Sequence, residues 1–256
     1  MIHKTAVIDP SAKIAENVQI SPYVVVGADV EIGSGTWIGS HVVISGPTKI
    51  GVDNRIYPFA SLGEAPQDKK FAGEATELII GDRNVIREYC TFNRGTVQDI
   101  GKTVVGSDNW IMAYVHIAHD CIIDNHTIMA NGTTLAGHVK IEDYAILGGF
   151  SLIHQFCRIG AYAFTGMGTS IAKDVPPFVM SFGAPGIPRG INREGMKRHG
   201  FSVDAIKHMK EAYRLLYRSE LTFQDALTTI ESRYGQFAEI DRLLTFCHKT
   251  ERGIIR

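Results

Sequence analysis

The segment most suited to chemistry is HIAHDC, residues 116–121, in which two histidines stand three residues apart and an aspartate follows the second. A neutral imidazole can accept a proton near pH 7, and a neighbouring carboxylate can orient it for that role. Imidazole and carboxylate groups also bind metal ions such as zinc. Such residues are common in solvated turns as well. Which of these three interpretations applies depends on where the backbone places the side chains.

Histidines are concentrated around this segment. Five of the ten histidines lie within residues 116–154, where an even distribution would place only one or two. They are His116, His119, His126, His138 and His154. Their relative positions can be predicted because a sequence repeat covers the region.

The repeat has a period of six residues. An apolar residue, nearly always aliphatic, occupies every sixth position over residues 2–62 and again over 80–171, with one extra residue after Phe92 and an exception at Thr165. A small or β-branched residue often stands four positions later, as at Thr127. An α-helix cannot bury this pattern, because six is not a multiple of 3.6. The pattern favours short strands joined by tight turns and wound into a parallel β-helix.

This hexapeptide repeat resembles that of the left-handed parallel β-helix, in which each coil has three sides of six residues. The left-handedness is implied by the resemblance, since the usual crossover preference is right-handed. The resemblance also implies a homotrimer with active sites between subunits.

Stacking of the coils brings distant residues together. With three repeats per coil and about 4.8 Å between coils, His119, His138 and His154 should lie on the same side of three successive coils. Asp120 and His138 are separated by one whole coil of sequence and should stack directly. Three histidines beside an aspartate favour a general base, His119, steered by Asp120, over unrelated turn residues.

A zinc site is the main alternative. Gamma-class carbonic anhydrases bind zinc through three histidines on a β-helix. The spacing here differs from theirs, because nothing at position 159 completes the pair of His119 and His154. We therefore expect no metal ion.

Two segments interrupt the repeat. The interval from Leu62 to Ile80 is one coil in length, and it contains the polar, turn-rich stretch GEAPQDKKFAGEATEL, which is predicted to project from the coil. Residues 92–105 span two repeats plus one residue. Loops that leave a solenoid commonly carry function. The repeat then ends at a series of prolines: Pro176, Pro177, Pro185 and Pro188.

The remainder of the chain is predicted to be helical. Ser202 and Thr222 each precede an apolar pattern of helical period and are suitable N-cap residues. A third apolar helical stretch covers residues 240–247. We therefore predict two domains, a β-helix with external loops at residues 1–188 and a small α-helical domain at residues 189–256.

Composition and charge exclude several classes of protein. The chain has 256 residues, of which 45% are hydrophobic, and a net charge of −1, as expected for a soluble globular protein and not for a disordered or nucleic-acid-binding one. No apolar run reaches the roughly 18 residues of a membrane span, and the start shows no signal-peptide pattern. Four cysteines without CxxC spacing favour the reducing cytoplasm. Three of them occupy inward positions of the repeat and are predicted to be core residues: Cys90, Cys121 and Cys157.

Charge is unevenly distributed. Residues 189–256 contain 13 Lys and Arg against 9 Asp and Glu, a net +4, whereas residues 1–188 carry a net −5. A basic segment of this kind predicts an acidic partner.

Six motifs spread over the whole chain are more specific. They are LGEAPQDKKFAGE (62–74), NRGT (93–96), HIAHDC (116–121), LAGH (135–138), HQF (154–156) and NREGMKRHGFS (192–202). Together they resemble the bacterial UDP-N-acetylglucosamine O-acyltransferases. The resemblance implies transfer of an (R)-3-hydroxyacyl chain from acyl carrier protein to the 3-hydroxyl of UDP-N-acetylglucosamine, the first step of lipid A biosynthesis. It implies no cofactor.

The resemblance also implies roles for individual residues. His119 would be the general base and Asp120 its orienting carboxylate. Gly137, which has no side chain, would let a backbone N–H approach the tetrahedral oxyanion. The sugar and adjoining groups would be bound by Asp68, Lys70, His116, His138, His154 and Gln155, and the nucleotide by Asn192, Glu194 and Arg198.

One further column bears on acyl chain length. Ala113, Asn131, Gly149 and Met167 follow one another at intervals of one whole coil and so occupy the same place in successive coils. By resemblance, the place of Met167 is that of the residue that limits acyl chain length. A methionine there predicts a shorter donor, near 3-hydroxydecanoyl, because one coil corresponds to roughly four methylenes.

Other functions compete with this one. The N-acyltransferase of the same pathway resembles the coils but carries an extra N-terminal domain that is not found in this sequence. A coenzyme A-dependent acetyltransferase and a catalytically inactive trimeric scaffold are the remaining alternatives. Two departures from the family pattern, Asn93 in place of histidine and the pair Ala184-Pro185 in place of Asn-His, leave the roles of those positions open.

Overall fold

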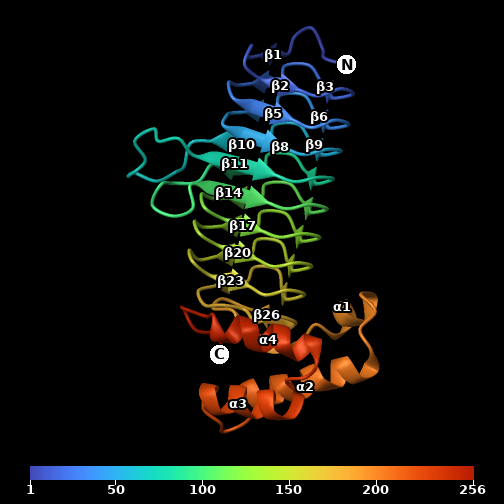
Figure 1. The fold of residues 1–256 in the computed structure, drawn as a ribbon, viewed down its shortest axis with the longest axis vertical. Helices are drawn as coiled ribbons and strands as arrows, with labels where there is room; N and C mark the ends of the chain where they lie inside the picture. Colours follow the sequence, from blue (N-terminus) through green and yellow to red (C-terminus); the bar gives the residue numbers. More distant parts are fainter.

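The computed structural model describes residues 1–256 and has a triangular coil of short strands followed by four helices (Figure 1). The predicted left-handed parallel β-helix with a helical C-terminal part is confirmed. The strands form three sheets, which we call faces 1, 2 and 3 in the order in which the chain enters them.

The strands of each face are as follows. Face 1 contains β1 (Val7–Ile8), β4 (Val25–Val26), β7 (Val43–Ile44), β10 (Ser61–Glu64), β13 (Thr91–Asn93), β16 (His116–Ile117), β19 (Thr134–Leu135), β22 (Leu152–Ile153) and β25 (Ser170–Ile171). Face 2 contains β2 (Lys13–Ile14), β5 (Val30–Ile32), β8 (Thr48–Ile50), β11 (Glu77–Ile80), β14 (Lys102–Val105), β17 (Ile122–Ile123), β20 (Lys140–Ile141) and β23 (Arg158–Ile159). Face 3 contains β3 (Gln19–Ile20), β6 (Trp37–Ile38), β9 (Arg55–Ile56), β12 (Val85–Ile86), β15 (Trp110–Ile111), β18 (Ile128–Met129), β21 (Ile146–Leu147), β24 (Phe164–Thr165), β26 (Val179–Phe182) and β27 (Ile187–Ile191).

Strand pairing follows the predicted register. His116 pairs with Thr134, its equivalent in the next coil, and the other uninterrupted coils pair in the same parallel way. Only β26 and β27 pair antiparallel, and this hairpin closes the C-terminal end of face 3. Because every strand is fixed to those above and below it, the position of a residue within its repeat determines the face or corner on which it lies.

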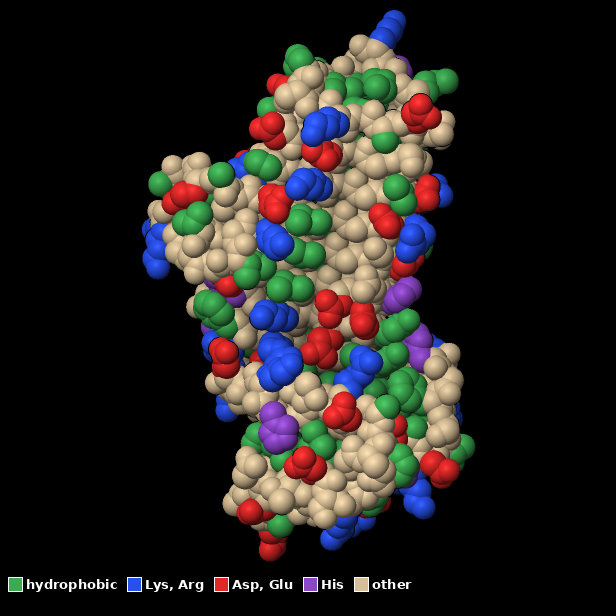
Figure 2. Space-filling view, viewed as in Figure 1, with side chains coloured by type: hydrophobic (Ala, Val, Ile, Leu, Met, Phe, Trp, Pro, Cys, Tyr) green, Lys and Arg blue, Asp and Glu red, His purple; other side chains and the backbone are tan.

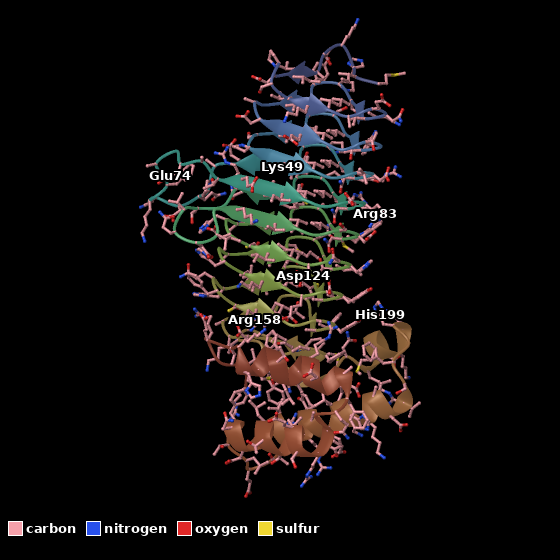
Figure 3. All side chains as sticks on the ribbon, in the orientation of Figure 1. Lys49, Glu74, Arg83, Asp124, Arg158 and His199 are labelled. Atoms are coloured by element: carbon pink, nitrogen blue, oxygen red, sulfur yellow. The ribbon has the colours of Figure 1, made fainter.

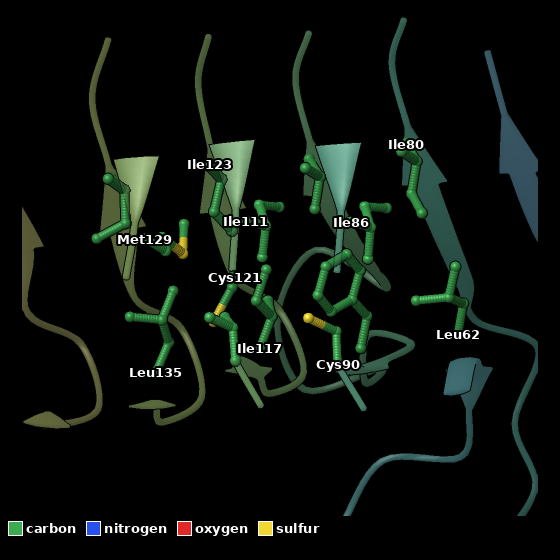
Figure 4. Close-up of a cluster of buried hydrophobic side chains, with 14 of the residues drawn as sticks. Leu62, Ile80, Ile86, Cys90, Ile111, Ile117, Cys121, Ile123, Met129 and Leu135 are labelled. Carbon is green, nitrogen blue, oxygen red and sulfur yellow. The ribbon is translucent and has the colours of Figure 1, made fainter. Parts of the chain in front are cut away.

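The core runs the length of the coil and is built from the repeat. Figure 4 shows the part of it that includes Ile86, Ile111 and Ile117. Ile117 and Cys121, at the two inward positions of one repeat, are both fully buried. Burial raises the pKa of the Cys90 and Cys121 thiols to about 12 and that of Cys157 to about 11. These three cysteines are core residues, as predicted.

The corners contain residues in the left-handed backbone region. Asp120, His138 and Phe156 have φ values of 58°, 63° and 63° and stand one above the other in successive coils. This conformation costs roughly 1–2 kcal/mol for a residue with a side chain, and stacking between coils offsets it. The corner between faces 1 and 2, which we call corner 1–2, therefore presents a column of polar and aromatic side chains.

Both interruptions of the repeat leave the coil at corner 1–2 (Figure 1). The first joins β10 to β11 and the second joins β13 to β14, so each advances the chain by a single side. The first of these segments was predicted to project from the coil, and the structure confirms this. Most of each segment projects, and the projecting parts are residues 65–76 and 94–101, called the first and second loops below.

Four helices follow the coil. They are α1 (Arg193–Arg198), α2 (Val203–Tyr217), α3 (Phe223–Tyr234) and α4 (Ala238–His248). The N-caps of α2 and α3 are Ser202 and Thr222, as predicted, whereas α1 was not foreseen. The helices share their own apolar core, which Phe178 joins from the end of the coil.

The chain passes from the coil to the helices over residues 187–193. β27 extends to Ile191 and so spans the predicted boundary at residue 188, and the first helix begins at Arg193. The C-terminal residues return to the coil, where the Ile255 N–H donates to the Asp174 carbonyl at 2.9 Å. No helix combines the length and the apolar character that a membrane crossing would require.

Candidate functional site

A hollow of about 1210 Å³ lies at corner 1–2, between the two loops and the coils that follow them. Its walls are almost entirely polar, with Phe156 as the only apolar residue. The lining residues come from the first loop (Gln67, Asp68, Lys69, Lys70), the second loop (Thr96, Gln98, Asp99), the coils (His119, His138, Lys140, Gln155, Phe156, Arg158) and the C-terminal end (Asp174, Lys249, Glu251). This composition suits a charged, hydroxyl-rich ligand more than an apolar one.

His119 and Asp120 form a hydrogen-bonded pair at the wall of the hollow. The Nδ1 atom of His119 lies 2.9 Å from Oδ2 of Asp120. Because a carboxylate only accepts hydrogen bonds, Nδ1 carries the proton and Nε2 presents its lone pair. The side chain of His119 is 16% exposed, whereas that of Asp120 is completely buried. The pair has the arrangement of a general base and its orienting carboxylate.

Asp120 is fixed by the second loop. Its carboxylate accepts hydrogen bonds from the Thr96 N–H at 2.9 and 3.1 Å and from the Thr96 hydroxyl at 2.6 Å. Its own N–H donates to the Thr103 hydroxyl at 2.9 Å. Burial alone would raise the pKa of Asp120, but the hydrogen bonds from His119 and Thr96 outweigh it and lower that pKa. Asp120 is therefore held as an anion beside His119.

Gly137 lies against the ring of His119 from the next coil. A Cβ atom at residue 137 would stand 2.6 Å from Cε1 and 2.8 Å from Nε2 of His119. The N–H of Gly137 has no hydrogen-bond partner within the chain. The absence of a side chain at Gly137 thus leaves room for the His119 ring, and the backbone N–H of this residue stays unpaired.

His138 is held from several directions. Its ring stacks on Phe156 with centroids 4.3 Å apart and meets the ring of His119 edge to face at 5.0 Å. Its Nδ1 lies 2.7 Å from Oδ2 of Asp99, a residue of the second loop that was not predicted to take part. The nearest oxygen of Asp120 is 3.9 Å from the same nitrogen.

His116 lies beside the hollow on β16 and is partly buried. Its Nδ1 is 2.7 Å from the Thr91 hydroxyl of the preceding coil. Burial lowers the pKa of His116, so this imidazole is neutral at physiological pH.

The loops are attached through the NRGT motif. The Asn93 side-chain N–H donates to the Ala65 carbonyl at 2.8 Å, and the Arg94 N–H donates to the Glu64 carbonyl at 3.0 Å. The Arg94 guanidinium donates to the Gly46 carbonyl. Asn93, whose role was left open, therefore fixes the base of the first loop.

Two predicted residues of the first loop face the hollow. Asp68 and Lys70 both line it, and Oδ1 of Asp68 accepts a hydrogen bond from the Lys70 N–H at 3.0 Å. Gln155 lines the hollow from the coil. His154 is exposed beside it, with Nδ1 3.2 Å from the Gln155 carbonyl, and is not part of its wall.

The remaining predicted residues lie elsewhere on the chain. Met167 follows β24 at the corner between faces 3 and 1, one full face away from His119, and its side chain is exposed. Asn192 caps α1, its Oδ1 accepting from the Gly195 N–H and its Nδ2 donating to the Tyr162 carbonyl. Glu194 and Arg198 are exposed on α1. Within one chain none of these four lines the hollow.

The one group of side chains that could hold a cation consists of His119, Asp120 and His138. One ligand atom each from His119, Asp120 and His138 lie within 4.8 Å of one another. The carboxylate of Asp120 is already occupied by three hydrogen bonds from Thr96 and a fourth from His119. This arrangement favours an orienting role for Asp120 over metal ligation.

Models of two protein families match the chain. The bacterial transferase hexapeptide model matches residues 11–46 and 102–137. The second domain of the UDP-N-acetylglucosamine O-acyltransferase model matches residues 174–255.

Relatives match over the full length. An acyl-[acyl-carrier-protein]–UDP-N-acetylglucosamine O-acyltransferase of Thiobacillus denitrificans is 54% identical, with 100% of this chain and 99% of the relative covered. The solved UDP-N-acetylglucosamine acyltransferase of Francisella novicida is 42% identical with a TM-score of 0.98, over 100% of this chain and 94% of that one. The Arabidopsis enzyme of the same name is 34% identical with a TM-score of 0.85, and both chains are covered completely. The chain belongs to the acyl-[acyl-carrier-protein]–UDP-N-acetylglucosamine O-acyltransferase family.

Proposed function

We propose that the protein transfers an (R)-3-hydroxyacyl chain from acyl carrier protein to the 3-hydroxyl of UDP-N-acetylglucosamine, the first step of lipid A biosynthesis. The observation that carries this proposal is the His119–Asp120 pair beside an unpaired Gly137 N–H in a polar hollow. The full-length relatives supply the substrate names. The four free, buried cysteines fit a reducing cytoplasm as its location.

The geometry suggests a direct acyl transfer. Nε2 of His119 removes the proton of the sugar hydroxyl while its oxygen attacks the thioester carbonyl carbon and a C–O bond forms. The carbonyl oxygen becomes an oxyanion, to which the Gly137 N–H donates. Collapse of this intermediate breaks the C–S bond, and the leaving thiolate takes the proton from His119. This acyl transfer needs no redox partner and no cofactor.

Binding of the sugar nucleotide is assigned to the walls of the hollow. Asp68, Lys70 and His138 present charged and hydrogen-bonding groups to it, and Gln155 adds an amide. His116 and His154 lie next to it, within reach of a ligand that extends past its edge.

A homotrimer would complete the site. Charged side chains pair across the N-terminal coils of face 2, with Lys13 2.8 Å from Glu31 and Lys49 3.3 Å from Glu77, and Figure 2 shows charged side chains along this face with apolar ones between them. Face 1 and the corner between faces 3 and 1 instead expose apolar and aromatic side chains, which mark protein contacts. They include Val7, Val25, Val43, Leu152, Tyr23, Phe59, Tyr89 and Tyr114.

If two copies of the chain contacted each other through these surfaces, residues of one copy would reach the hollow at corner 1–2 of the other. We assign Met167 to the acyl chain and Asn192, Glu194 and Arg198 to the nucleotide in this way, because none of them reaches the hollow of its own chain. For Asn192, Oδ1 already caps α1 and Nδ2 donates one hydrogen to Tyr162, so a contact with the nucleotide would use the remaining lone pair of Oδ1 or the second N–H of Nδ2.

One assay tests the function. The protein is incubated with UDP-N-acetylglucosamine and 3-hydroxyacyl carrier proteins of several lengths, and the O-acylated sugar nucleotide is measured. Product with acyl carrier protein but not with acyl coenzyme A is expected, and a donor Michaelis constant that rises with salt would fit docking on the basic helices. Product with acyl coenzyme A alone, or no product with any donor, would contradict the proposal.

A further inference from the structure

The ring of His138 has one free polar atom. Phe156 covers one face of the ring at 4.3 Å with an interplanar angle of 8°, and His119 meets it at 88°. Asp99 lies at Nδ1, 2.7 Å away. The side chain of His138 is only 14% exposed, so its position is determined by these three neighbours. What remains available to a ligand is Nε2.

Asp99 determines whether Nε2 of His138 carries a proton. An aspartate carboxylate accepts and does not donate hydrogen bonds, so Nδ1 of His138 must carry the proton that lies between them. In the neutral imidazole Nε2 is then an acceptor. Without Asp99, the proton could reside on either nitrogen, and Nδ1 would face only the more distant Asp120 oxygen at 3.9 Å.

Asp99 lies on the same loop that fixes the first histidine. Thr96 donates two kinds of hydrogen bond to Asp120, which orients His119, and Asp99 accepts from His138. The loop is closed on itself by the Gly101 N–H, which donates to the Thr96 carbonyl at 3.0 Å. The second loop thus carries both Thr96 and Asp99, whose hydrogen bonds position His119 and His138. The ring centroids of these two histidines are 5.0 Å apart.

We propose that Asp99 is a positioning residue that fixes His138 with Nε2 as a hydrogen-bond acceptor for a hydroxyl of the sugar substrate. The second loop is then a common support for both histidines, with Thr96 acting through Asp120 on His119 and Asp99 acting directly on His138. This inference rests on the proposed function, because it takes the ligand of His138 to be the acceptor sugar.

The inference has a kinetic signature. Loss of the carboxylate leaves Nε2 protonated in part of the molecules, and these cannot accept a hydrogen bond from the sugar. We expect Asp99→Asn to raise the Michaelis constant for UDP-N-acetylglucosamine about 2- to 10-fold, the range that corresponds to the net contribution of a hydrogen bond between neutral groups. The Michaelis constant for the acyl carrier protein donor and the melting temperature should remain close to those of the wild type.

The experiment is a double-mutant cycle on the full-length protein. Steady-state constants for both substrates are measured for the wild type, Asp99→Asn, His138→Ala and the double variant. Ile100→Ala, an exposed neighbour on the same loop, is the matched control and should behave as the wild type. Asp99→Glu should recover part of the loss. Thermal unfolding of every variant separates a positioning effect from a folding defect.

The outcomes are distinct. If Asp99→Asn adds nothing to the effect of His138→Ala, the two residues act together as proposed. Additive effects of the two changes, or a wild-type sugar Michaelis constant in Asp99→Asn, would overturn the inference. Equal losses for both substrates together with a lower melting temperature would also overturn it, since they indicate support of the loop alone. An inactive wild type would contradict the proposed function instead.

Discussion

The α-carbon of Gly137 faces the imidazole of His119 so closely that a methyl group there would stand 2.6 Å from Cε1. Gly137→Ala must therefore displace the ring or the coil, and a misplacement of about 1 Å can cost roughly 10²-fold in rate. We expect kcat to fall by about that factor with little change in melting temperature. Gly27→Ala is the control, because a Cβ there would meet nothing closer than 3.3 Å. Full activity of Gly137→Ala would show that this contact does not set the position of His119.

Removal of the general base should abolish most turnover. We expect His119→Ala to lower kcat by about 10²- to 10⁴-fold, the usual contribution of general base catalysis, while the protein stays folded. His126→Ala, at another corner, where the ring stacks on Tyr144, is the matched control. Exhaustive chelation of the wild type should leave its activity unchanged, because no metal ion is expected. Near-normal turnover of His119→Ala, measured as product formed per enzyme, would remove His119 from the mechanism.

Asp124, which follows β17 and is labelled in Figure 3, should make the stability of the protein depend on pH. Burial, with the nearby charges of Asp143 and Glu142, raises the pKa of Asp124 to about 6. Since this pKa is raised in the folded protein, the native state binds more protons between about pH 4 and 6, and its stability decreases as pH rises through that window.

Asp124→Asn removes the buried charge. We expect it to stabilise the protein at pH 8 by roughly 1 kcal/mol, less than the pKa shift alone implies because solvent screens the half-exposed carboxyl. The gain in free energy of unfolding should disappear near pH 4, where the wild-type carboxyl is protonated in the folded protein. Urea unfolding at the two pH values measures it, with Glu220→Gln on an exposed turn as the control. A gain that is the same at both pH values would contradict this account.

Met167 should set the preferred acyl chain length. If a second copy brings this exposed side chain against the acyl chain, Met167→Gly opens about one coil of space, or roughly four methylenes. The optimum should move from near 3-hydroxydecanoyl to longer donors without loss of activity. Competition between donors of different lengths measures this. Met112→Gly, three coils earlier beside the same corner, should leave the profile unchanged, and an identical profile for Met167→Gly would remove its proposed role.

The period of six predicted most of the fold. Because every repeat buries its aliphatic and its small residue, positions such as Ile117 and Cys121 could be assigned to the core from spacing alone. The same period predicted that Asp120 and His138 stack, since one whole coil of sequence separates them. The corner of Met167 also follows from spacing: the stretch from His119 to Met167 is not a whole number of coils, so the two cannot share a corner.

The parts outside the repeat could not be predicted in this way. The contacts of Thr96 and Asp99 depend on the path of a loop that has no periodicity, so these residues were missed. The six residues of α1 are too short to show a helical pattern. The length of a segment also does not reveal how far it advances the coil: residues 62–80 match a full coil in length but connect the neighbouring faces 1 and 2.

The attachment of the two loops has a consequence for local opening. Each coil of the stack can open only by breaking the ladders on both sides of it, whereas residues 65–76 and 94–101 are tied down by a small number of hydrogen bonds. His119 and His138 belong to the cooperative part, and Asp99 belongs to the part with low opening free energy. Local opening of the second loop would therefore remove the Thr96 and Asp99 supports of the two histidines while the coil that carries them stays intact.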